Sequence, residues 1–402
     1  MHLVRRGLRS LRSTPCNVVA LLILLLIYIF HPPSTIKSPS EPRRQKSTHD
    51  STPTYEHLSP YRALADHAFE SSLEAQLTAL EKHVGQAGTE ANQTVWQIGT
   101  RDEAEMWAQW RKQWHIGDPE WKYELLTTSE ADAAPILSLY SDIPEVTNAY
   151  ADFPALRTDL LRYLILWYHG GFFAEVDTWP RVALKFCSPI VQVTSGRHNI
   201  SLMVGVEIDE PYLNPETKAV WKWSRSFGFG QAVVWAPRRF DPILRRAIVR
   251  AITHMKMQAW MQDQQEPESV WRRFFGRRRI SNMGEVSGSS MLTDCVLDVL
   301  SETLRQDHAI RDREAGLERR VTWKHFRKLE QPVWIDPEET EARQLADLDM
   351  RGLAVLPINI WASGQRHSRS GSFEMDEACV DHVFGRTPAG MHKGFMNRIF
   401  GW

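Results

Sequence analysis

The segment from Arg162 to Asp177, RYLILWYHGGFFAEVD, constrains the fold of this chain more than any other. Its first half has the apolar spacing of an amphipathic helix, and the pair Gly170-Gly171 predicts the end of that helix. The apolar run Phe172–Val176 then predicts a short buried strand. The segment therefore indicates a helix, a tight turn and a strand in direct succession.

Two acidic side chains follow this strand in the pattern Glu175-x-Asp177. Carboxylates at a strand end offer the hard oxygen ligands that Mg²⁺ and Mn²⁺ prefer. A metal held there can neutralise the charge that develops on a departing diphosphate. The pattern favours an enzyme that uses a sugar nucleotide, although an acidic pair of this kind also occurs in solvated turns.

A further charged pair, Asp159 and Arg162, precedes the glycines. Residues three apart share one face of a helix, so the two side chains are expected to lie together. They would either form a salt bridge or contact a ligand, and the spacing alone does not separate these readings.

The whole segment resembles the signature of the family 32 glycosyltransferases, which runs D-x-x-R-Y-x-x-L-x-x-x-G-G-x-Y-x-D-x-D. The positions in register are Asp159, Arg162, Tyr163, Leu166, Gly170, Gly171 and Asp177. Phe173 replaces the usual Tyr, and Glu175 replaces the first Asp. This family includes fungal Golgi mannosyltransferases.

The resemblance implies a catalytic centre built from Asp177, Arg162 and Asp159. Asp177 would bind the metal directly, and Glu175 would meet the ribose, or the metal through water. Asp159 and Arg162 would contact hydroxyl groups of the donor sugar. The implied cofactor is Mn²⁺ or Mg²⁺.

Later segments resemble further parts of the family pattern. Asp381 to Gly385, DHVFG, resembles H-x-F-x-G-S-W, which would make His382 another metal ligand, but the Ser-Trp is missing. Asp209 ends a strand-like run, and Asp294 lies in SGSSMLTD, which resembles T-G-P-x-x-x-T-D. Both are candidates for binding the donor or acceptor sugar, with helix caps or turn residues as the alternative.

Strand-like and helix-like segments alternate from Thr94 onward, which favours an α/β fold with a mainly parallel mixed sheet. Ligands of such sheets gather at the carboxyl ends of strands. The resemblance makes this fold a single Rossmann-like domain of the GT-A type. We place it at residues 91–402.

The amino terminus predicts a different organisation. A basic tail (1–16) precedes an apolar run (17–31), and a polar linker (32–90) with a helix at 62–84 follows. A basic flank stays cytosolic, so the run predicts a signal anchor of a type II membrane protein with residues 32–402 in the lumen. The family resemblance implies that this membrane is the Golgi membrane. A cleaved signal peptide is the alternative.

Composition excludes some functions. The formal net charge of −1 argues against nucleic acid as the main partner. Beyond Cys16, the cysteines Cys187, Cys295 and Cys379 permit at most one internal disulfide and one unpaired thiol. The absence of a C-x-x-C motif disfavours zinc and iron–sulfur centres.

These observations lead to one expected function and its rivals. The expected enzyme transfers α-1,6-mannose from GDP-mannose, with retention, to N-glycan or mannan acceptors, and other Golgi mannosyltransferase subunits are candidate partners. One rival is a different donor, such as UDP-galactose, or a sphingolipid acceptor. The other is a non-catalytic subunit of a mannan-synthesising complex. The departures at Glu175, at Phe240-Asp241 (where the family has Gly-His before a Pro) and after Gly385 keep this alternative open.

Overall fold

The computed structural model describes residues 61–85, 91–221, 223–265, 282–313, 319–341 and 351–383. All of them belong to one compact unit, which begins at Pro53. The predicted basic tail, the apolar run and most of the linker lie outside the described residues, as does the Arg-rich stretch 272–279. Among the described helices, none has both the length and the apolar character needed to cross a membrane.

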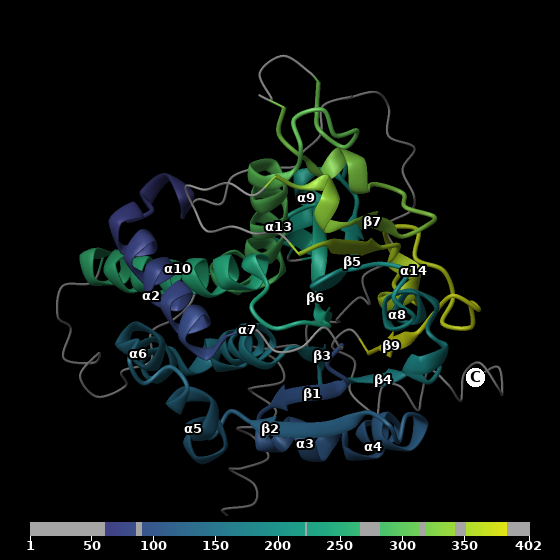
Figure 1. The fold of residues 1–402 in the computed structure, drawn as a ribbon, viewed down its shortest axis with the longest axis horizontal. Coiled ribbons are helices and arrows are strands. Elements are labelled where there is room, and N and C mark those ends of the chain that lie inside the picture. Colours follow the sequence, from purple (N-terminus) through teal and green to yellow (C-terminus); the bar gives the residue numbers. More distant parts are fainter. Residues whose placement is uncertain are drawn as a thin grey trace, which may run out of the picture. The chain divides into compact units, whose positions relative to one another are not determined.

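A seven-stranded mixed sheet runs through the unit (Figure 1). In spatial order its strands are β2 (Lys122–Thr127), β1 (Thr94–Gly99), β3 (Gly171–Ala174), β6 (Phe227–Ala236), β5 (Leu202–Asp209), β8 (Leu353–Leu356) and β7 (Val333–Ile335). Pairing is parallel along β2–β1–β3 and between β5 and β8, and antiparallel at β3–β6, β6–β5 and β8–β7. A separate two-stranded sheet joins β4 (Thr178–Pro180) to β9 (Val380–His382).

Helices surround these strands, and the expected mixed α/β architecture is confirmed. They are α2 (His67–Val84), α3 (Arg101–Met106), α4 (Ala108–Gly117), α5 (Glu130–Ser138), α6 (Pro144–Asp152), α7 (Arg157–His169), α8 (Ser188–Thr194), α9 (Pro215–Val220), α10 (Pro242–Gln265), α12 (Met283–Val286), α13 (Ser289–Thr303) and α14 (Ile358–Trp361). Short 3₁₀ turns are η1 (Arg62–Leu64), η2 (Pro154–Leu156), η3 (Leu184–Phe186), η4 (Trp323–Phe326) and η5 (Pro337–Glu339).

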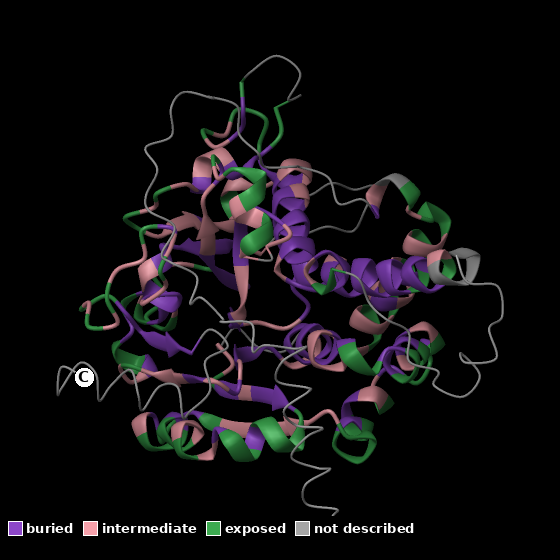
Figure 2. Ribbon diagram, turned by 180° about the vertical axis from the view of Figure 1, so that it is seen from behind, coloured by how far each residue is buried: buried purple, intermediate pink, exposed green. Residues whose placement is uncertain are grey.

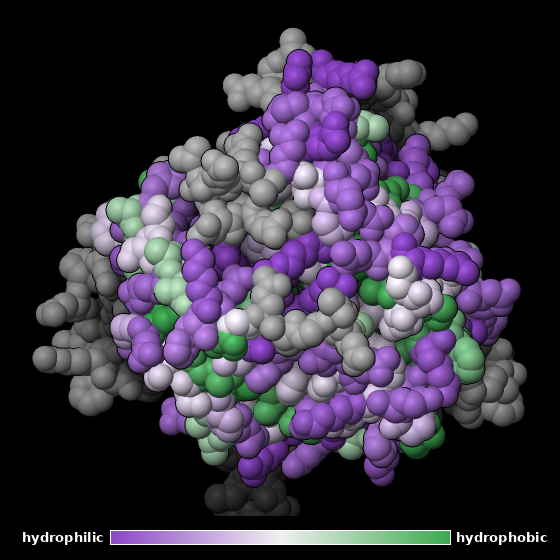
Figure 3. Space-filling view, in the orientation of Figure 1, coloured by the Kyte–Doolittle hydropathy of each residue, from purple (hydrophilic) through white to green (hydrophobic). Residues whose placement is uncertain are grey.

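The two faces of the sheet are buried in separate clusters, because side chains alternate along each strand. Phe173 of β3 and Val234 of β6 pack against the apolar faces of α7, α10 and α13. Their neighbours Phe172 and Trp235 face the opposite way and pack with Trp361 of α14. Figure 2 shows the resulting buried strands between partly exposed helices. Hydrophilic side chains predominate on the face drawn in Figure 3, with apolar ones in small groups.

Local sequence explains where the long helix α10 begins. The Asp241 side chain accepts hydrogen bonds from the backbone N–H groups of Ile243 and Leu244 at 2.8 and 3.0 Å. Pro242 occupies the first helical position, where its missing N–H has no helical partner to lose. Asp241 and Pro242 together thus mark the start of α10, which runs on to Gln265.

The structure differs from the predicted domain boundary at residue 91. The helix expected in the linker is present as α2, but Leu73 and Leu77 are fully buried in the main hydrophobic cluster. Glu81 of the same helix forms ion pairs with Arg245 and Arg351 at 2.9 and 2.8 Å. Helix α2 therefore belongs to the folded unit instead of a stem.

Candidate functional site

The turn between α7 and β3 requires both of its glycines. Gly170 has φ +74° and Gly171 has φ +108°, where side-chain-bearing residues are strained. A Cβ at Gly171 would lie 2.7 Å from the carbonyl oxygen of Thr94 and 2.5 Å from Nε1 of Trp96. The absence of a side chain lets β3 lie directly beside β1.

The residues just past β3 are held by their backbone. The carbonyl oxygen of Glu175 accepts hydrogen bonds from Gln97 Nε2 (2.8 Å), Thr178 N (3.0 Å) and Thr178 Oγ1 (2.6 Å). The N–H of Glu175 donates to the carbonyl of Ala232 at 2.8 Å. This turn fixes where the carboxylates of Glu175 and Asp177 emerge.

His382 comes to the same place through β9, which pairs with β4 so that Thr178 lies opposite His382. Its Nε2 lies 3.3 Å from Oδ1 of Asp177 and 3.7 Å from Oε2 of Glu175. One ligand atom from each residue lies within 4.8 Å of the other two. We call Glu175, Asp177 and His382 the acid–histidine cluster; it unites the three residues predicted as metal ligands.

The donor set fits a divalent cation. Two carboxylates and an imidazole are ligands that Mn²⁺ and Mg²⁺ accept, and the side chains of Glu175 and Asp177 are 30% and 18% exposed. Burial lowers the pKa of His382, but its hydrogen bond to Asp177 and the nearby carboxylates outweigh this, and the pKa is raised. Burial raises the pKa of Glu175 against the opposing charge of Arg162. A bound cation would offset the electrostatic repulsion between the carboxylates of Glu175 and Asp177.

Arg162 lies beneath the cluster with 1% of its side chain exposed. Nη1 donates to Asp159 Oδ1 at 2.8 Å, and Nη2 donates to Glu175 Oε1 at 3.1 Å. The guanidinium also stacks over the ring of Phe173, 4.5 Å from its centroid. The predicted Asp159–Arg162 pair is therefore present as a salt bridge. Because the Arg162 side chain is buried, its guanidinium faces Glu175 instead of solvent and holds that carboxylate in position.

Asp159 connects the site to a second part of the chain. Its Oδ2 accepts a hydrogen bond from Ser287 Oγ at 2.7 Å, and its Oδ1 accepts one from Gln231 Nε2 at 3.4 Å. These contacts tie α7 to β6 and to the residues before α13. Asp159 is thereby well supplied with protein donors.

The structure places Asp209 and Asp294 outside the cluster. Oδ2 of Asp209 accepts from the N–H of Lys328 at 2.7 Å, and Oδ1 lies 3.5 Å from Nε of Arg327. Asp294 is buried with Arg225, which also pairs with Glu285 at 2.7 Å. Both aspartates thus make structural ion pairs, and these contacts account for them without a sugar.

Glu207 is not among the site residues predicted from the sequence. It lines a pocket that His382 also borders. Burial raises the pKa of Glu207, and the positive charges of His382 and Arg162 act in the opposite direction. The signal available in the sequence was a carboxylate near the end of an otherwise apolar strand.

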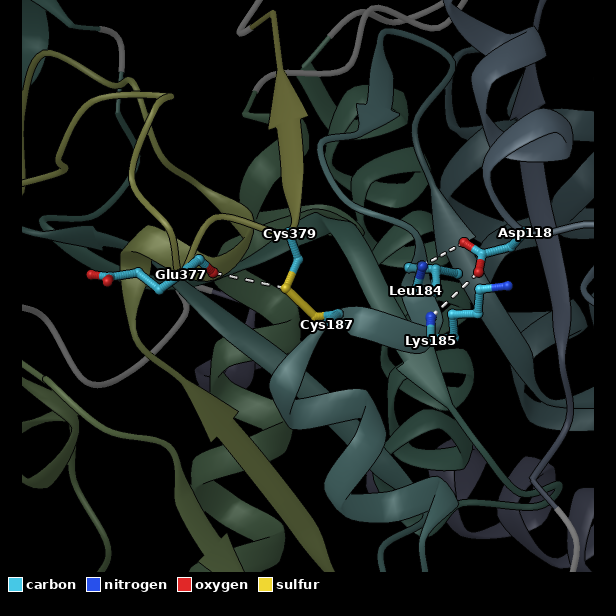
Figure 4. The surroundings of a disulfide bond; sticks show 6 residues. All are labelled: Asp118, Leu184, Lys185, Cys187, Glu377 and Cys379. Atoms are coloured by element: carbon cyan, nitrogen blue, oxygen red, sulfur yellow. Dashed lines mark hydrogen bonds between the residues drawn. A yellow bond between two sulfur atoms is a disulfide. The ribbon is translucent and has the colours of Figure 1, made fainter.

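A disulfide secures the strand that carries His382. Cys187 and Cys379 are bonded, with Cα atoms 5.5 Å apart (Figure 4). Cys295 is buried with a free thiol. This agrees with the prediction of at most one bridge. Near Cys187, the Asp118 side chain accepts hydrogen bonds from the backbone N–H groups of Leu184 and Lys185. The bridge therefore joins β9 to a segment that is itself anchored.

Part of this chain is similar in sequence to proteins of known family. Residues 104–193 match the family described as the glycosyltransferase sugar-binding region containing the DXD motif. This range includes α7, β3 and the acidic pair. This part of the chain is thus similar to the DXD-containing glycosyltransferases. Glycosyltransferases with this motif typically bind a divalent metal.

Curated relatives agree with this assignment. HOC1 of Saccharomyces cerevisiae, named as a glycosyltransferase, is 30% identical over 59% of this chain and 54% of its own length. The initiation-specific alpha-1,6-mannosyltransferases of Candida albicans and Schizosaccharomyces pombe are 25% and 24% identical, over 60% and 47% of this chain and 60% and 43% of their own lengths. The chain thus spans about half the length of the curated relatives it matches.

Among solved structures, the PaToxG glycosyltransferase aligns with 59% of this chain and 78% of its own, at 14% identity and a TM-score of 0.30. At this score the alignment adds nothing to the assignment.

Proposed function

We propose that this protein is a metal-dependent glycosyltransferase that transfers mannose from GDP-mannose to N-glycan or mannan acceptors with retention of configuration. The acid–histidine cluster carries the proposal, because it gathers metal-binding groups at the carboxyl end of a central strand. The relatives named as α-1,6-mannosyltransferases support mannose and the α-1,6 linkage. The parallel β2–β1–β3 half of the sheet supports a fold of the GT-A type.

Each residue of the cluster has a proposed task. Asp177 and His382 hold the divalent cation, either Mn²⁺ or Mg²⁺, and Glu175 faces the same space while Arg162 fixes its orientation. The cation, when bound, supplies positive charge against the diphosphate as it leaves. Asp159 holds the far side of the Arg162 guanidinium, so the whole carboxylate array is set before substrate arrives.

The proposed transfer takes place on one face of the sugar. The bond from the anomeric carbon to the diphosphate oxygen breaks, and the acceptor oxygen bonds to that carbon from the same side. The acceptor's proton passes to an oxygen of the departing diphosphate. Fixed charges lower the barrier here more than proton transfer by a side chain does.

We further propose that the protein resides in the Golgi membrane as a single-pass type II protein. The support is the basic tail at 1–16 and the apolar run at 17–31. Full-length protein is expected to stay in the membrane pellet after carbonate washing. A mature protein that begins after residue 30 would contradict the anchor.

The activity is tested with purified protein, Mn²⁺ and a mannose-terminated acceptor. GDP-mannose is expected to be consumed faster than GDP-glucose or UDP-galactose, and EDTA is expected to stop the reaction. If UDP-galactose is consumed faster than GDP-mannose, the proposed donor is wrong and UDP-galactose takes its place. A protein that binds neither GDP nor UDP with Mn²⁺ would favour a non-catalytic subunit of a mannan-synthesising complex.

A further inference from the structure

A partly open pocket lies beside the acid–histidine cluster, with His382 in its wall. Glu207 of β5, Gly230 of β6 and Trp361 of α14 form other parts of the wall. An aromatic ring and a carboxylate together suit a sugar, whose C–H groups pack on the ring while its hydroxyls donate hydrogen bonds. Because the pocket borders the cluster, it is next to the place where a diphosphate would bind.

Glu207 differs from the other carboxylates of the site in its lack of protein donors. Asp159 accepts hydrogen bonds from Arg162, Gln231 and Ser287, and Glu175 accepts one from Arg162. In the part of the chain that the structure describes, the Glu207 carboxylate has no such bond or ion pair. A half-buried carboxylate without a donor is costly, so it is expected to serve a ligand.

The strand opposite leaves room for this carboxylate. A Cβ at Gly230 would lie 3.2 Å from Oε2 and 3.3 Å from Cβ of Glu207, so the Glu207 side chain extends over the glycine. The backbone of Glu207 is fixed as well, because its carbonyl accepts a hydrogen bond from Gln365 Nε2 at 3.3 Å. The position of Glu207 is thus set by the sheet, and its carboxylate stays available to the pocket.

We propose that Glu207 accepts hydrogen bonds from hydroxyl groups of the transferred sugar and helps to determine which sugar the enzyme accepts. The proposal rests on the proposed function, since it assigns the pocket beside the cluster to the sugar of a nucleotide-sugar donor.

The test compares full-length wild type with Glu207→Gln and Glu207→Ala, and with Glu216→Gln on exposed α9 as the control. Calorimetry with Mn²⁺ measures binding of GDP alone and of GDP-mannose, GDP-glucose and UDP-galactose. Both Glu207 variants are expected to bind GDP like wild type and to lose about tenfold or more of the extra affinity that the sugar provides. Their melting temperature should not fall, because the substitution removes no protein contact of the carboxylate.

Kinetics separate this proposal from the proposed function. In the Glu207 variants, the preference for GDP-mannose over GDP-glucose in kcat/KM is expected to shrink about tenfold, while Glu216→Gln keeps it. If wild type uses another donor, the proposed function fails. The role of Glu207 is then tested by measuring how much affinity the sugar of that other donor adds in wild type and in the Glu207 variants. Unchanged sugar affinity and unchanged preference in both variants would overturn the role of Glu207, as would a wild type for which no sugar adds affinity to its nucleotide.

Discussion

The Nε2 atom of His382 lies 3.3 Å from Oδ1 of Asp177, and the N–H of the next residue, Val383, donates to the carbonyl of Asp177 at 3.2 Å. The side-chain contact is thus accompanied by a backbone hydrogen bond between the same two segments. Two ligand groups that are far apart in the sequence are therefore held together before any cation binds.

Removal of either ligand should abolish tight metal binding. Asp177→Ala and His382→Ala each take one ligand atom from the cluster, and Mn²⁺ affinity is expected to fall more than about 100-fold, because even outer-shell partners cost 10–100-fold. Calorimetric titration with Mn²⁺ in the presence of GDP measures this. Asp142→Ala, which changes an exposed aspartate, is the control. Wild-type affinity in Asp177→Ala would rule out the metal site.

Arg162→Ala should destabilise the protein as well as its site. The change leaves Asp159 and Glu175 without their shared cation, and breaking a buried pair costs about 3–5 kcal/mol. Chemical unfolding measures the loss. Arg305→Ala is the control, since Arg305 and its carboxylate partner Asp307 are 53% and 76% exposed and such a pair contributes little. Equal stability of the two variants would contradict the structural role of Arg162.

The sequence predicted those parts of the fold that depend on local pattern. The α7–Gly-Gly–β3 segment follows from apolar periodicity and from the conformational preference of glycine, which act between residues close in sequence. The acid–histidine cluster was anticipated from motif resemblance, and the structure brings its three members together.

Contacts between distant segments could not be predicted in the same way. Helix α2 has the composition of a linker helix, and only its packing against α10 shows that it belongs to the folded unit. The burial of Arg162 depends on its packing over Phe173 of β3, which the i,i+3 spacing does not reveal. Glu207 was missed because a carboxylate near a strand end becomes informative only when its missing partners can be seen.

The disulfide should support metal binding at a distance. Cys379→Ser releases β9 from the segment at Cys187, so unfolding free energy is expected to fall by about 2–5 kcal/mol and Mn²⁺ affinity to fall with it. Urea unfolding and Mn²⁺ calorimetry measure the two effects. Cys295→Ala changes the free buried thiol and should leave the Mn²⁺ affinity intact. An unaltered affinity in Cys379→Ser would show that β9 needs no tether.

Acidification should weaken the fold through His254. Its ring stacks on Tyr61, and Nδ1 lies 3.0 Å from the carbonyl of Glu285. Burial, assisted by the charge of Arg250, lowers the His254 pKa from 6.5 to about 3. Between these values the unfolded chain takes up a proton that the folded protein does not, so stability falls as pH drops below 6.5.

The variant His254→Gln isolates this effect, because its amide can still donate to the carbonyl but does not titrate. Urea midpoints at about pH 7 and about pH 5 are expected to differ less in the variant than in wild type, since most carboxylates remain ionised there. The same pH dependence in both proteins would assign the acid sensitivity to other groups.

The pairing of β4 with β9 also sets the order in which the protein can mature. During translation the acidic pair emerges long before His382 and Cys379, and contacts between such distant segments form late. A nascent chain that has reached β8 already carries Glu175 and Asp177 but lacks the imidazole beside them. If the proposed function holds, a chain whose synthesis stops before Val383 would therefore be unable to consume donor.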